Sequence, residues 1–491
     1  MAGGRWPGGR RVAGGFGLGA VMALGQAPLG WWWATLPALA GLIWMIGRES
    51  APWRAFWLGL FGGAGYFALA LSWIVEPFLI DVARHGWMAP FALVLLAFGL
   101  ALFWGAAAAL SVGARHRALG LAVALAGMEA VRGYIFTGFP WAQIGHVWIG
   151  TPLDQLAAFA GPEALTAMTV LATAVVVVWR WRGAVAAGLA LGTVAAGGAW
   201  RLDAPLPGDR EVTLRLVQPN AEQHLKWDAS RAQLYFDRLR TLTAEGTPAD
   251  LTIWPETAVP YMLEYSPEVA PMITDASGGR PVMLGIQRTD GTRFWNSLRV
   301  LEHDGLEVAL YDKQHLVPCG EYVPLGDLLG DWFGMTAFAA QAGATYSAGP
   351  GPAVLNLGRF GKVIPLICYE AVFPREVNDV PERADWIVQI TNDAWFGVWT
   401  GPFQHFAQAR LRAVEQGLPL VRVANTGVTA VIDARGRVVA ELPFGTMGAL
   451  DAALPGALPP TVYSRLGEGP FILLLAGLGL LTLRRGRVAG H

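Results

Sequence analysis

The chain has 491 residues, of which 54% are hydrophobic and 15% are charged, and its formal net charge is -1. This composition excludes a disordered protein and a basic nucleic-acid-binding protein, and it is too apolar for an ordinary soluble enzyme. The charges are unevenly placed, because residues 1–200 carry 17 Asp, Glu, Lys and Arg side chains and residues 201–491 carry the other 56. We therefore expect a membrane-embedded first part and a water-exposed second part.

Apolar runs close to the length of a bilayer crossing, about 20 residues, recur through the first part and once near the end. Helices are the expected spanning element, because lipid offers no partner to open backbone groups. The runs are 12–28, 30–47, 55–75, 88–112, 118–134, 157–179, 183–200 and 468–484. They predict seven transmembrane helices over 1–200, and an eighth helix with a short tail over 468–491. Buried helices of a soluble protein are the alternative, which the scarcity of charge disfavours.

The distribution of arginine predicts the orientation. The N-terminus, every second connection and the C-terminal tail carry two or three Arg residues each, and such segments face the cytoplasm. Both termini are then cytoplasmic, and residues 201–467 lie on the opposite side of the membrane. A cleaved signal peptide over the first run would leave seven crossings without moving this domain. Glu129 and Arg132, three residues apart near the end of a run, indicate an i,i+3 pair at the membrane edge.

A different pattern begins at residue 211 and predicts an α/β domain. Short β-branched runs follow one another, with helical stretches at about 229–244 and 402–416. Several runs are continuously apolar, as expected of strands covered on both faces. The expected strands are 211–217, 250–254, 281–286, 296–301, 307–312, 363–368, 385–390, 419–424, 428–433 and 437–441. This order indicates sheets sandwiched between helices, with a hairpin between the eighth and ninth strands.

Three of these strands end in reactive side chains. Glu256 follows a strand in LTIWPETAVP, Lys313 follows one in YDKQHLVPCGEYVP, and Cys368 ends one in KVIPLICYEAVFPR. Strand ends at one edge are where α/β domains commonly place their sites. A carboxylate can take the thiol proton, while an ammonium group can lower the thiol pKa and stabilise an oxyanion. Together the three groups predict acyl transfer through a thioester, although each alone is more typical of packing, a cap or a surface charge.

The motifs together resemble the nitrilase superfamily, whose sites use a Glu–Lys–Cys triad. With the membrane helices, the chain resembles the apolipoprotein N-acyltransferases, the integral-membrane branch of that superfamily. The resemblance rests on WPE at 254–256, K-x-H-L-V-P-x-G-E at 313–321 and I-C-Y-E at 367–370, and it covers nearly the whole chain. It implies an α-β-β-α sandwich over 201–467 beside a bundle of eight transmembrane helices.

The same resemblance implies a role for each motif residue. Glu256 would be the general base, Lys313 the oxyanion stabiliser and Cys368 the nucleophile. Glu321 matches a second glutamate of the family, which would hold Lys313 or assist the base. A departure from the family pattern is Cys319, where an aromatic residue is expected; no pairing of the two cysteines follows from the sequence.

Further segments extend the resemblance beyond the triad. Tyr369 and Glu370 would support the loop of the nucleophile. Trp227, in VQPNAEQHLKWD, falls at a tryptophan that the family links to substrate binding, with a packing role as the alternative. The segment TNDAWFG at 391–397 is similar to one near the nitrilase site, although its Asn and Asp are also ordinary turn residues. Lysine is rare, since Lys226, Lys313 and Lys362 are the only three, so each is a candidate for a special role.

The resemblance implies an enzyme of the bacterial inner membrane, with its catalytic domain in the periplasm. The acyl donor would be a membrane phospholipid, and the acceptor would be the α-amine of the N-terminal diacylglyceryl-cysteine of an apolipoprotein. This reaction would be the last step of lipoprotein maturation. It needs no cofactor, because the donor is already an activated ester; the eight histidines show no metal spacing. A monomer without a nucleic-acid partner is expected.

Three other functions fit parts of the sequence. His315 or His405 could serve Cys368 as a base in a papain-like arrangement. A membrane-tethered amidase would use the same triad, and only the membrane helices and the acyl donor distinguish it. A transporter or receptor with a degenerate nitrilase-like domain is disfavoured by the intact triad and by the few charges within the apolar runs.

Overall fold

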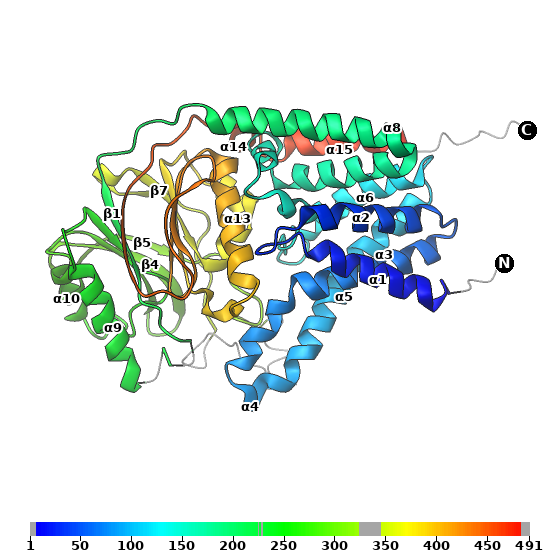
Figure 1. The fold of residues 1–491 in the computed structure, drawn as a ribbon. Coiled ribbons are helices and arrows are strands. Elements are labelled where there is room, and N and C mark those ends of the chain that lie inside the picture. Colours follow the sequence, from blue (N-terminus) through cyan, green and yellow to red (C-terminus); the bar gives the residue numbers. More distant parts are fainter. Residues whose placement is uncertain (1–5, 224, 227–228, 324–344, 483–491) are drawn as a thin grey trace, which may run out of the picture. The chain divides into compact units, whose positions relative to one another are not determined.

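The computed structural model describes every residue except 1–5, 224, 227–228, 324–344 and 483–491. The chain divides into two compact units. The helical unit comprises Met1–Ala204, Trp399–Ala407 and Thr461–His491, and the sheet unit comprises Pro205–Val398 and Gln408–Pro460. Figure 1 shows helices through the first unit and strands through the second.

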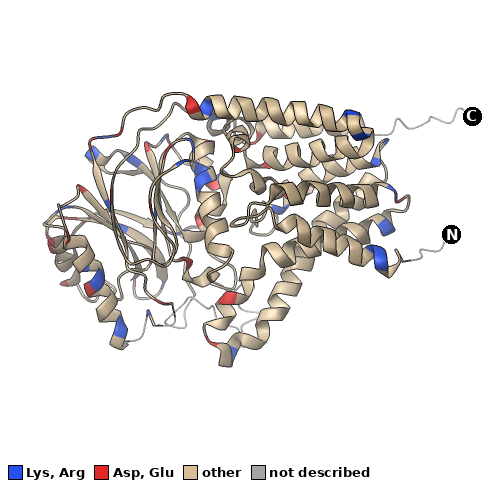
Figure 2. Cartoon of the chain, viewed as in Figure 1, with Lys and Arg blue, Asp and Glu red and all other residues tan. Residues whose placement is uncertain are grey.

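The helical unit is built from the apolar runs of the sequence. Its longer helices are α1 (Gly9–Ala23), α2 (Trp32–Gly47), α3 (Pro52–Ala70), α5 (Ala89–Ser111), α6 (Arg117–Arg132), α8 (Pro162–Asp203) and α15 (Gly469–Thr482). Short α-helices connect them: α4 (Val82–His85), α7 (Ala157–Ala160) and α14 (Val462–Leu466). Figure 2 shows that charged residues are sparse along these helices and lie mostly near their ends. This is the distribution expected of segments that avoid exposing charge to lipid.

Helix α8 contains two of the predicted runs, 157–179 and 183–200. Its helical conformation is interrupted at Arg180, which has a φ of 53°. A Cβ atom added to Gly183 would lie 2.1 Å from the carbonyl oxygen of Val175. Residues eight apart in a continuous helix are about 12 Å apart along the axis, so the chain folds back at Arg180 and the two runs form separate helical segments.

The helices differ in their ability to cross a bilayer. By length and composition alone, the described residues contain two candidates, Val82–Ser111 and Pro162–Asp203, and the second is counted as one helix although it folds back at Arg180. A third is added if Pro52–Ala70 and Ser72–Leu79, which are bent by 49°, count as one span. Trp32–Gly47 and Gly469–Thr482 are apolar but shorter. Apolar helices are therefore present, and the predicted number of eight crossings stays a prediction.

The sheet unit contains two six-stranded sheets. The strand order of the first is β12-β1-β2-β3-β4-β5 and that of the second is β11-β10-β9-β8-β7-β6. The strands are β1 (Thr213–Gln218), β2 (Leu251–Ile253), β3 (Val282–Thr289), β4 (Phe294–Glu302), β5 (Leu306–Asp312), β6 (Leu355–Asn356), β7 (Lys362–Ile367), β8 (Trp386–Thr391), β9 (Leu420–Ala424), β10 (Thr429–Ile432), β11 (Val438–Leu442) and β12 (Gly448–Ala453). In each sheet the parallel strands lie at the centre, β1-β2-β3 in one and β7-β8-β9 in the other.

Helices cover the first sheet. Helix α9 (Ala229–Ala244) and helix α10 (Val269–Ala276) pack on it through a buried cluster that includes Phe236, Trp254 and Ile286. Residues 408–416 of helix α13 (Gly401–Gln416) and the short helix α12 (Pro374–Asn378) belong with the second sheet, whose β8 and β9 are buried along their whole length. The fully buried central strands explain why these runs are continuously apolar in the sequence.

The strand predictions are confirmed at all ten positions, within one to three residues at each end. The hairpin of β9 with β10 is confirmed as an antiparallel pair. The predictions missed β6, β12 and helix α10. Strand β12 has the sequence GALDAA, without a β-branched or aromatic residue, and it forms by antiparallel pairing with β1. A strand of such low propensity is stabilised by its distant partner and not by its own residues.

Candidate active site

Strand β2 positions Glu256 through a turn that packs closely on β3. Trp254, fully buried, donates from its indole nitrogen to Thr243 Oγ1 at 2.8 Å and fixes the end of the strand against α9. The turn then pairs with Gly285, whose carbonyl accepts from Ala258 N at 2.8 Å. A Cβ atom on Gly285 would lie 2.5 Å from Glu256 Cα, so only glycine fits there. The apolar strand and this glycine together set the place of the carboxylate.

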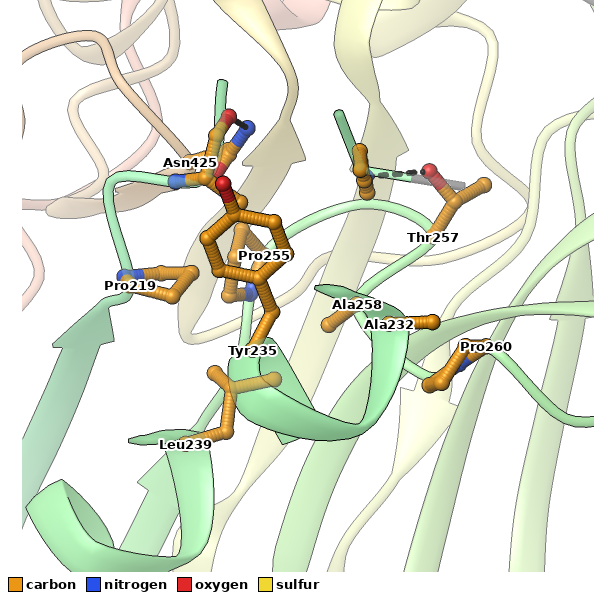
Figure 3. Close-up of a pocket in the computed structure, with 11 residues that line it drawn as sticks. Pro219, Ala232, Tyr235, Leu239, Pro255, Thr257, Ala258, Pro260 and Asn425 are labelled. Atoms are coloured by element: carbon orange, nitrogen blue, oxygen red, sulfur yellow. Dashed lines mark hydrogen bonds between the residues drawn. The ribbon is translucent and has the colours of Figure 1, made fainter. Parts of the chain in front are cut away.

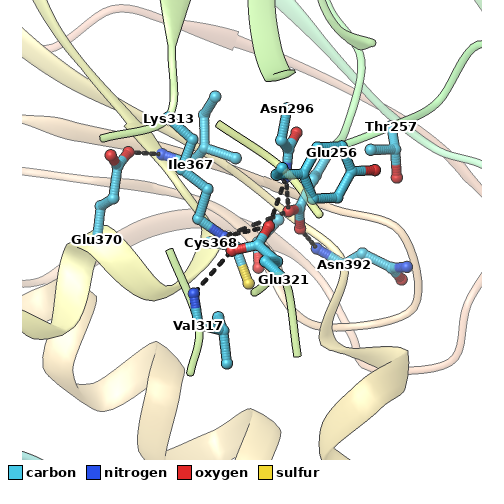
Figure 4. A network of polar contacts seen from close by, with 12 residues as sticks. Glu256, Thr257, Asn296, Lys313, Val317, Glu321, Ile367, Cys368, Glu370 and Asn392 are labelled. Atoms are coloured by element: carbon cyan, nitrogen blue, oxygen red, sulfur yellow. Dashed lines mark hydrogen bonds and ion pairs between the residues drawn. The ribbon is translucent and has the colours of Figure 1, made fainter. Parts of the chain in front are cut away.

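The carboxylate of Glu256 is buried, at 6% exposure, and hydrogen-bonded on both oxygens. Oε1 accepts from Asn296 Nδ2 at 2.7 Å, and Oε2 accepts from the backbone N–H of Asn392 at 2.8 Å. Lys313 Nζ lies 3.8 Å from Oε1 (Figure 4). The carboxylate is thus held in place by two hydrogen-bond donors and lies next to a cation.

Lys313 follows β5 and is 1% exposed. Its backbone N–H donates to Asn296 O at 2.9 Å, and its Nζ lies 3.0 and 2.9 Å from the two oxygens of Glu321. Although burial opposes the charge, the carboxylates of Glu321 and Glu256 raise the pKa of Lys313 above its usual value. The side chain is therefore a permanently charged ammonium group at a fixed position.

Glu321 belongs to the turn that follows Lys313, and it holds the ammonium group in place. Its Oε2 accepts from the backbone N–H of Val317 at 2.8 Å, and its Oε1 accepts from Asn296 Nδ2 at 3.1 Å. One side-chain amide thus donates to both Glu256 and Glu321. The two carboxylates are kept apart, with Lys313 in ionic contact with each of them.

Cys368 stands where β7 ends and a 3₁₀ turn over Cys368–Val372 begins. Its φ is 54°, a left-handed conformation that a side chain rarely adopts. Gln389 Nε2 donates to its carbonyl oxygen at 3.0 Å and so helps to hold the strained backbone. Strain of this kind is typical of positions whose orientation matters for chemistry.

The thiol of Cys368 is 5% exposed and lies beside the ammonium and carboxylate groups (Figure 4). Burial raises its pKa well above the ordinary value and the Glu256 carboxylate raises it further, whereas Lys313 lowers it. At neutral pH the resting group is therefore a thiol and not a thiolate. Attack on an acyl group then requires a base that takes the proton as the sulfur reacts.

Glu370 supports the turn that begins at Cys368 through hydrogen bonds of its carboxyl group. Its Oε1 accepts from Tyr311 Oη and Gln314 N, both at 2.8 Å, and its Oε2 accepts from Ile367 N at 2.7 Å. Burial raises the pKa of Glu370 to about 7, against the lowering effect of these hydrogen bonds. The carboxyl group links the Lys313 strand to the Cys368 turn.

The structure brings five of the seven predicted site residues into this network: Glu256, Lys313, Glu321, Cys368 and Glu370. Tyr369 is buried next to them, with its ring 4.9 Å from that of Phe373 in an edge-on contact. Trp227 lies outside the described residues. Cys319 is exposed and unpaired, and its pKa is raised by burial of part of the side chain.

Sequence reasoning missed two residues that position the site. Asn296, in FWNSLRV, is a polar residue within an apolar strand, and this pattern could have indicated a role in the site. Asn392 was considered an ordinary turn residue, yet its backbone holds Glu256 and its side chain bonds to Gln223 and Asn425 at 2.6 and 2.9 Å. Asn296 acts through its side-chain amide and Asn392 through its backbone amide, and neither kind of contact has a recognisable sequence motif.

The geometry does not support a histidine as the base for Cys368. His315 Nδ1 lies 2.6 Å from Glu376 Oε1, and its ring stacks on Phe373 at 3.8 Å. His405 belongs to the helical unit, where it stacks on Trp141. Among the described residues, no group of three or more His, Cys, Asp and Glu side chains could hold a metal ion. The site offers a base, a fixed cation and a thiol, the groups that acyl transfer requires.

Known proteins resemble the chain along most of its length. Residues 18–175 match the apolipoprotein N-acyltransferase N-terminal domain, and residues 209–458 match the carbon-nitrogen hydrolase family. An apolipoprotein N-acyltransferase of Caulobacter vibrioides is 38% identical over 95% of this chain and 93% of its own length. One of Allorhizobium ampelinum is 37% identical over 90% and 89%.

Solved structures resemble the chain more distantly. A mutant of the Nesterenkonia AN1 amidase, from the nitrilase superfamily, is 17% identical with a TM-score of 0.37, and it covers 55% of this chain and 99% of its own. A CN-hydrolase superfamily protein of Xanthomonas campestris is 19% identical with a TM-score of 0.36, covering 54% and 97%.

Proposed function

This chain belongs to the apolipoprotein N-acyltransferase family, and from that premise we propose that it transfers an acyl chain from a membrane phospholipid, through a thioester on Cys368, to the α-amine of an N-terminal diacylglyceryl-cysteine. The product is a triacylated lipoprotein, the end of lipoprotein maturation. The observation that best supports this function is the Lys313 ammonium group, 1% exposed and held between the carboxylates of Glu256 and Glu321 beside a buried thiol.

In the first half-reaction, Glu256 takes the proton of the Cys368 thiol as the sulfur attacks the ester carbonyl, at the sn-1 acyl group of the phospholipid. Lys313 stabilises the negative oxygen of the tetrahedral intermediate. The ester C–O bond then breaks, and the proton held by Glu256 passes to the departing alkoxide. A lysophospholipid leaves, and the acyl chain stays on Cys368 as a thioester.

In the second half-reaction, the free α-amine of the diacylated protein attacks the thioester. Glu256 accepts a proton from the amine nitrogen, Lys313 stabilises the oxyanion again, and the C–S bond breaks. The sulfur recovers its proton, and an amide is formed. Glu321 keeps Lys313 in position, Tyr369 and Glu370 support the nucleophile turn, and Trp227 contributes to substrate binding.

The membrane helices suit this chemistry because both substrates are lipids. A site anchored next to the bilayer meets two substrates that are confined to one leaflet, which raises their effective concentration. We propose eight crossings, with a membrane domain over 1–200, a catalytic domain over 201–467, and a last helix and tail over 468–491. The catalytic domain then faces the periplasm, both termini face the cytoplasm, and the protein acts as a monomer in the bacterial inner membrane.

This topology is tested with single introduced cysteines. Ser50→Cys and Thr247→Cys place a thiol at exposed positions of a predicted cytoplasmic connection and of the catalytic domain. Both are made in a Cys319→Ala/Cys368→Ala background, so that the introduced cysteine is the only thiol, and treated with a membrane-impermeant maleimide in cells with a permeabilised outer membrane. Only the Thr247→Cys protein is expected to react before cell lysis. Reaction of Ser50→Cys in intact cells, or protection of Thr247→Cys, would reverse the proposed orientation.

The acyl-enzyme is tested by intact-protein mass spectrometry. The purified protein is incubated in detergent micelles with phosphatidylethanolamine, and a mass increase of one acyl chain is expected together with released lysophospholipid. Cys368→Ala abolishes both signals, whereas Cys319→Ala, the matched control at the other cysteine, retains them. An acyl adduct that persists in Cys368→Ala would move the nucleophile, and no adduct in an active preparation would refute the thioester.

A second arm identifies the acceptor. A diacylated peptide with a free α-amine is added to the acyl-enzyme, and the same peptide with an acetylated amine is the control. The free amine is expected to discharge the thioester and gain the acyl chain. Equal discharge in both reactions, with release of free fatty acid, would identify a hydrolase instead.

A further inference from the structure

Two of the three lysines of the chain are buried in the sheet unit. Lys313 is 1% exposed and Lys226 is 6% exposed. Lys362, at the start of β7, forms an ion pair with Glu382 through side chains that are 41% and 48% exposed. A buried lysine is costly unless its ammonium group has protein partners, so Lys226 requires an explanation that the proposed mechanism does not provide.

The ammonium group of Lys226 is bound to the turn that carries Glu256. Its Nζ donates to the carbonyl oxygen of Glu256 at 3.1 Å and to Thr257 Oγ1 at 2.9 Å. Thr257 has a φ of 44°, which is unfavourable for a β-branched residue. The two hydrogen bonds therefore act on a strained turn, directly next to the proposed general base.

Lys226 itself comes from a segment that is tied to the same site. Ala221 exchanges two hydrogen bonds of 2.8 Å with the side chain of Asn425. Gln223 Oε1 accepts from Asn392 Nδ2 at 2.6 Å, and the backbone N–H of Asn392 donates to Glu256. The segment is thus attached to Glu256 from two directions, by Asn392 and by Lys226.

The surroundings of Lys226 are mostly apolar. It lines a small pocket with residues that include Pro219, Tyr235, Leu239 and Pro255, and Figure 3 shows the Thr257 hydroxyl at the same pocket. Among the residues that the structure describes, its titratable neighbours include Glu256, after β2, and Tyr235, on α9. Burial lowers the pKa of Lys226 to about 8, and the charge of Glu256 acts in the opposite direction.

We propose that Lys226 is a positioning residue for the general base: its ammonium group binds the Glu256–Thr257 turn through two hydrogen bonds and so keeps the Glu256 carboxylate where it can take the proton of Cys368. Glu256 is then flanked by two cations with different tasks. Lys313 faces the reacting atoms, whereas Lys226 acts from the backbone side. The identity of the base comes from the proposed function, but the proton transfer can be measured without any acyl donor.

The test measures alkylation of Cys368 by iodoacetamide as a function of pH. All proteins carry Cys319→Ala, so that Cys368 is the only thiol. Relative to this background, Lys226→Met is expected to react about 10-fold more slowly at pH 7, with the pH midpoint raised by roughly one unit, because a thiol whose base is no longer held in place must ionise without its help. Above pH 8 the difference in rate between the two proteins should narrow, since the ammonium group of Lys226 then loses its proton.

Two further variants separate charge from packing. Lys362→Met, the matched control at the exposed lysine, is expected to keep the background rate and midpoint. Lys226→Arg keeps the charge and is expected to restore the midpoint. Should Lys226→Met fail to fold, Lys226→Gln, which keeps a donor without the charge, takes its place in the comparison.

Two results would overturn the proposal. One is a folded Lys226→Met or Lys226→Gln protein with an unchanged rate and midpoint. The other is a slower reaction with an unchanged midpoint, which would make Lys226 only a structural spacer. Neither depends on phospholipid, so a failure to detect the acyl-enzyme would refute the acyltransferase proposal and leave this result standing.

Discussion

The Glu129–Arg132 pair of the helical unit and the Lys313 cluster of the sheet unit are both buried, but their charges are balanced differently. In the helical unit, Arg132 Nε donates to Glu129 Oε1 at 3.1 Å and its second terminal nitrogen to Oε2 at 2.8 Å. Trp104 adds a 2.8 Å hydrogen bond to Glu129, and Arg132 also donates to Trp141 O at 2.9 Å. Glu129 and Arg132 are 1% and 2% exposed. The pair is neutral and its hydrogen-bonding groups are occupied.

The sheet unit instead places one ammonium group, Lys313, between two carboxylates and next to a thiol whose pKa burial has raised. A proton in this cluster has more than one possible position, whereas the Glu129–Arg132 pair has no such choice. Perturbed groups with alternative proton positions are typical of catalytic sites. The difference separates charges that stabilise the fold from charges that we propose take part in the chemistry, and each can be changed independently.

The largest effect is expected at Lys313. Lys313→Met leaves Glu256 and Glu321 buried without their shared cation, which should cost about 3–5 kcal/mol of stability. It also removes the proposed oxyanion stabiliser, which should lower the rate of Cys368 acylation by about 100- to 1000-fold. Thermal unfolding in detergent and single-turnover lysophospholipid release measure the two effects.

Lys313→Arg sharpens this prediction. It keeps the charge and so should recover most of the stability, but the planar guanidinium group cannot replace a compact ammonium near an oxyanion. The acylation rate should therefore stay low. A near-normal rate in Lys313→Arg would show that only the charge of Lys313 matters.

Glu256→Gln should have the next largest effect. The amide keeps the size of the side chain but cannot accept a proton, so acylation should slow by about 100- to 10,000-fold. One of its two ends would also present an N–H group to the N–H donors of Asn296 and Asn392, which weakens the network. Iodoacetamide alkylation of Cys368 across pH should show the loss of base assistance, and an unchanged pH profile would exclude Glu256 as the base.

Glu129→Gln tests the other side of the comparison. Removal of this carboxylate leaves Arg132 buried without its counter-charge, with an expected cost of about 3–5 kcal/mol. The acylation rate per folded molecule should not change, because the pair belongs to the helical unit and not to the catalytic network. Glu76→Gln, at a partly exposed acid of the same unit, is the control and should unfold at the native temperature. A lower acylation rate in folded Glu129→Gln would contradict the separation of roles.

The sequence predicted the three residues of the proposed triad because their signal is local. Glu256, Lys313 and Cys368 each follow an apolar strand, and each lies in a motif that resembles the nitrilase superfamily. Asn296 was not predicted, because its partners, Glu256 and Glu321, are 40 and 25 residues away in the chain. The rarity of lysine marked Lys226, but its acceptor is a backbone carbonyl, which no sequence pattern reveals.

The same reasoning applies to the fold. The helical runs and ten of the strands were predictable because their apolar periodicity is encoded in consecutive residues. Strand β12 was not predictable, because it forms by pairing with β1, which is its neighbour in the sheet but lies more than 200 residues earlier in the chain. The Glu129–Arg132 pair was predicted at its correct spacing, but its burial was not, because burial depends on Trp104 and on the loop beyond α6.

The smallest effect concerns Glu370, whose pKa burial raises to about 7 from an ordinary value of 4.5. In the unfolded chain this carboxyl group loses its proton near its ordinary pKa, whereas in the folded protein it keeps the proton until about pH 7. Between these values the unfolded state binds fewer protons, so stability should fall as pH rises, by on the order of 3 kcal/mol in total. Thermal unfolding between pH 4.5 and 8 should show this decline in stability in the native protein. The decline should be absent in Glu370→Gln, whose side chain cannot ionise. Glu129→Gln should retain the decline in full, because its missing charge belongs to the helical unit. A native stability that rises over this pH window would mean that the hydrogen-bond donors around Glu370 outweigh its burial.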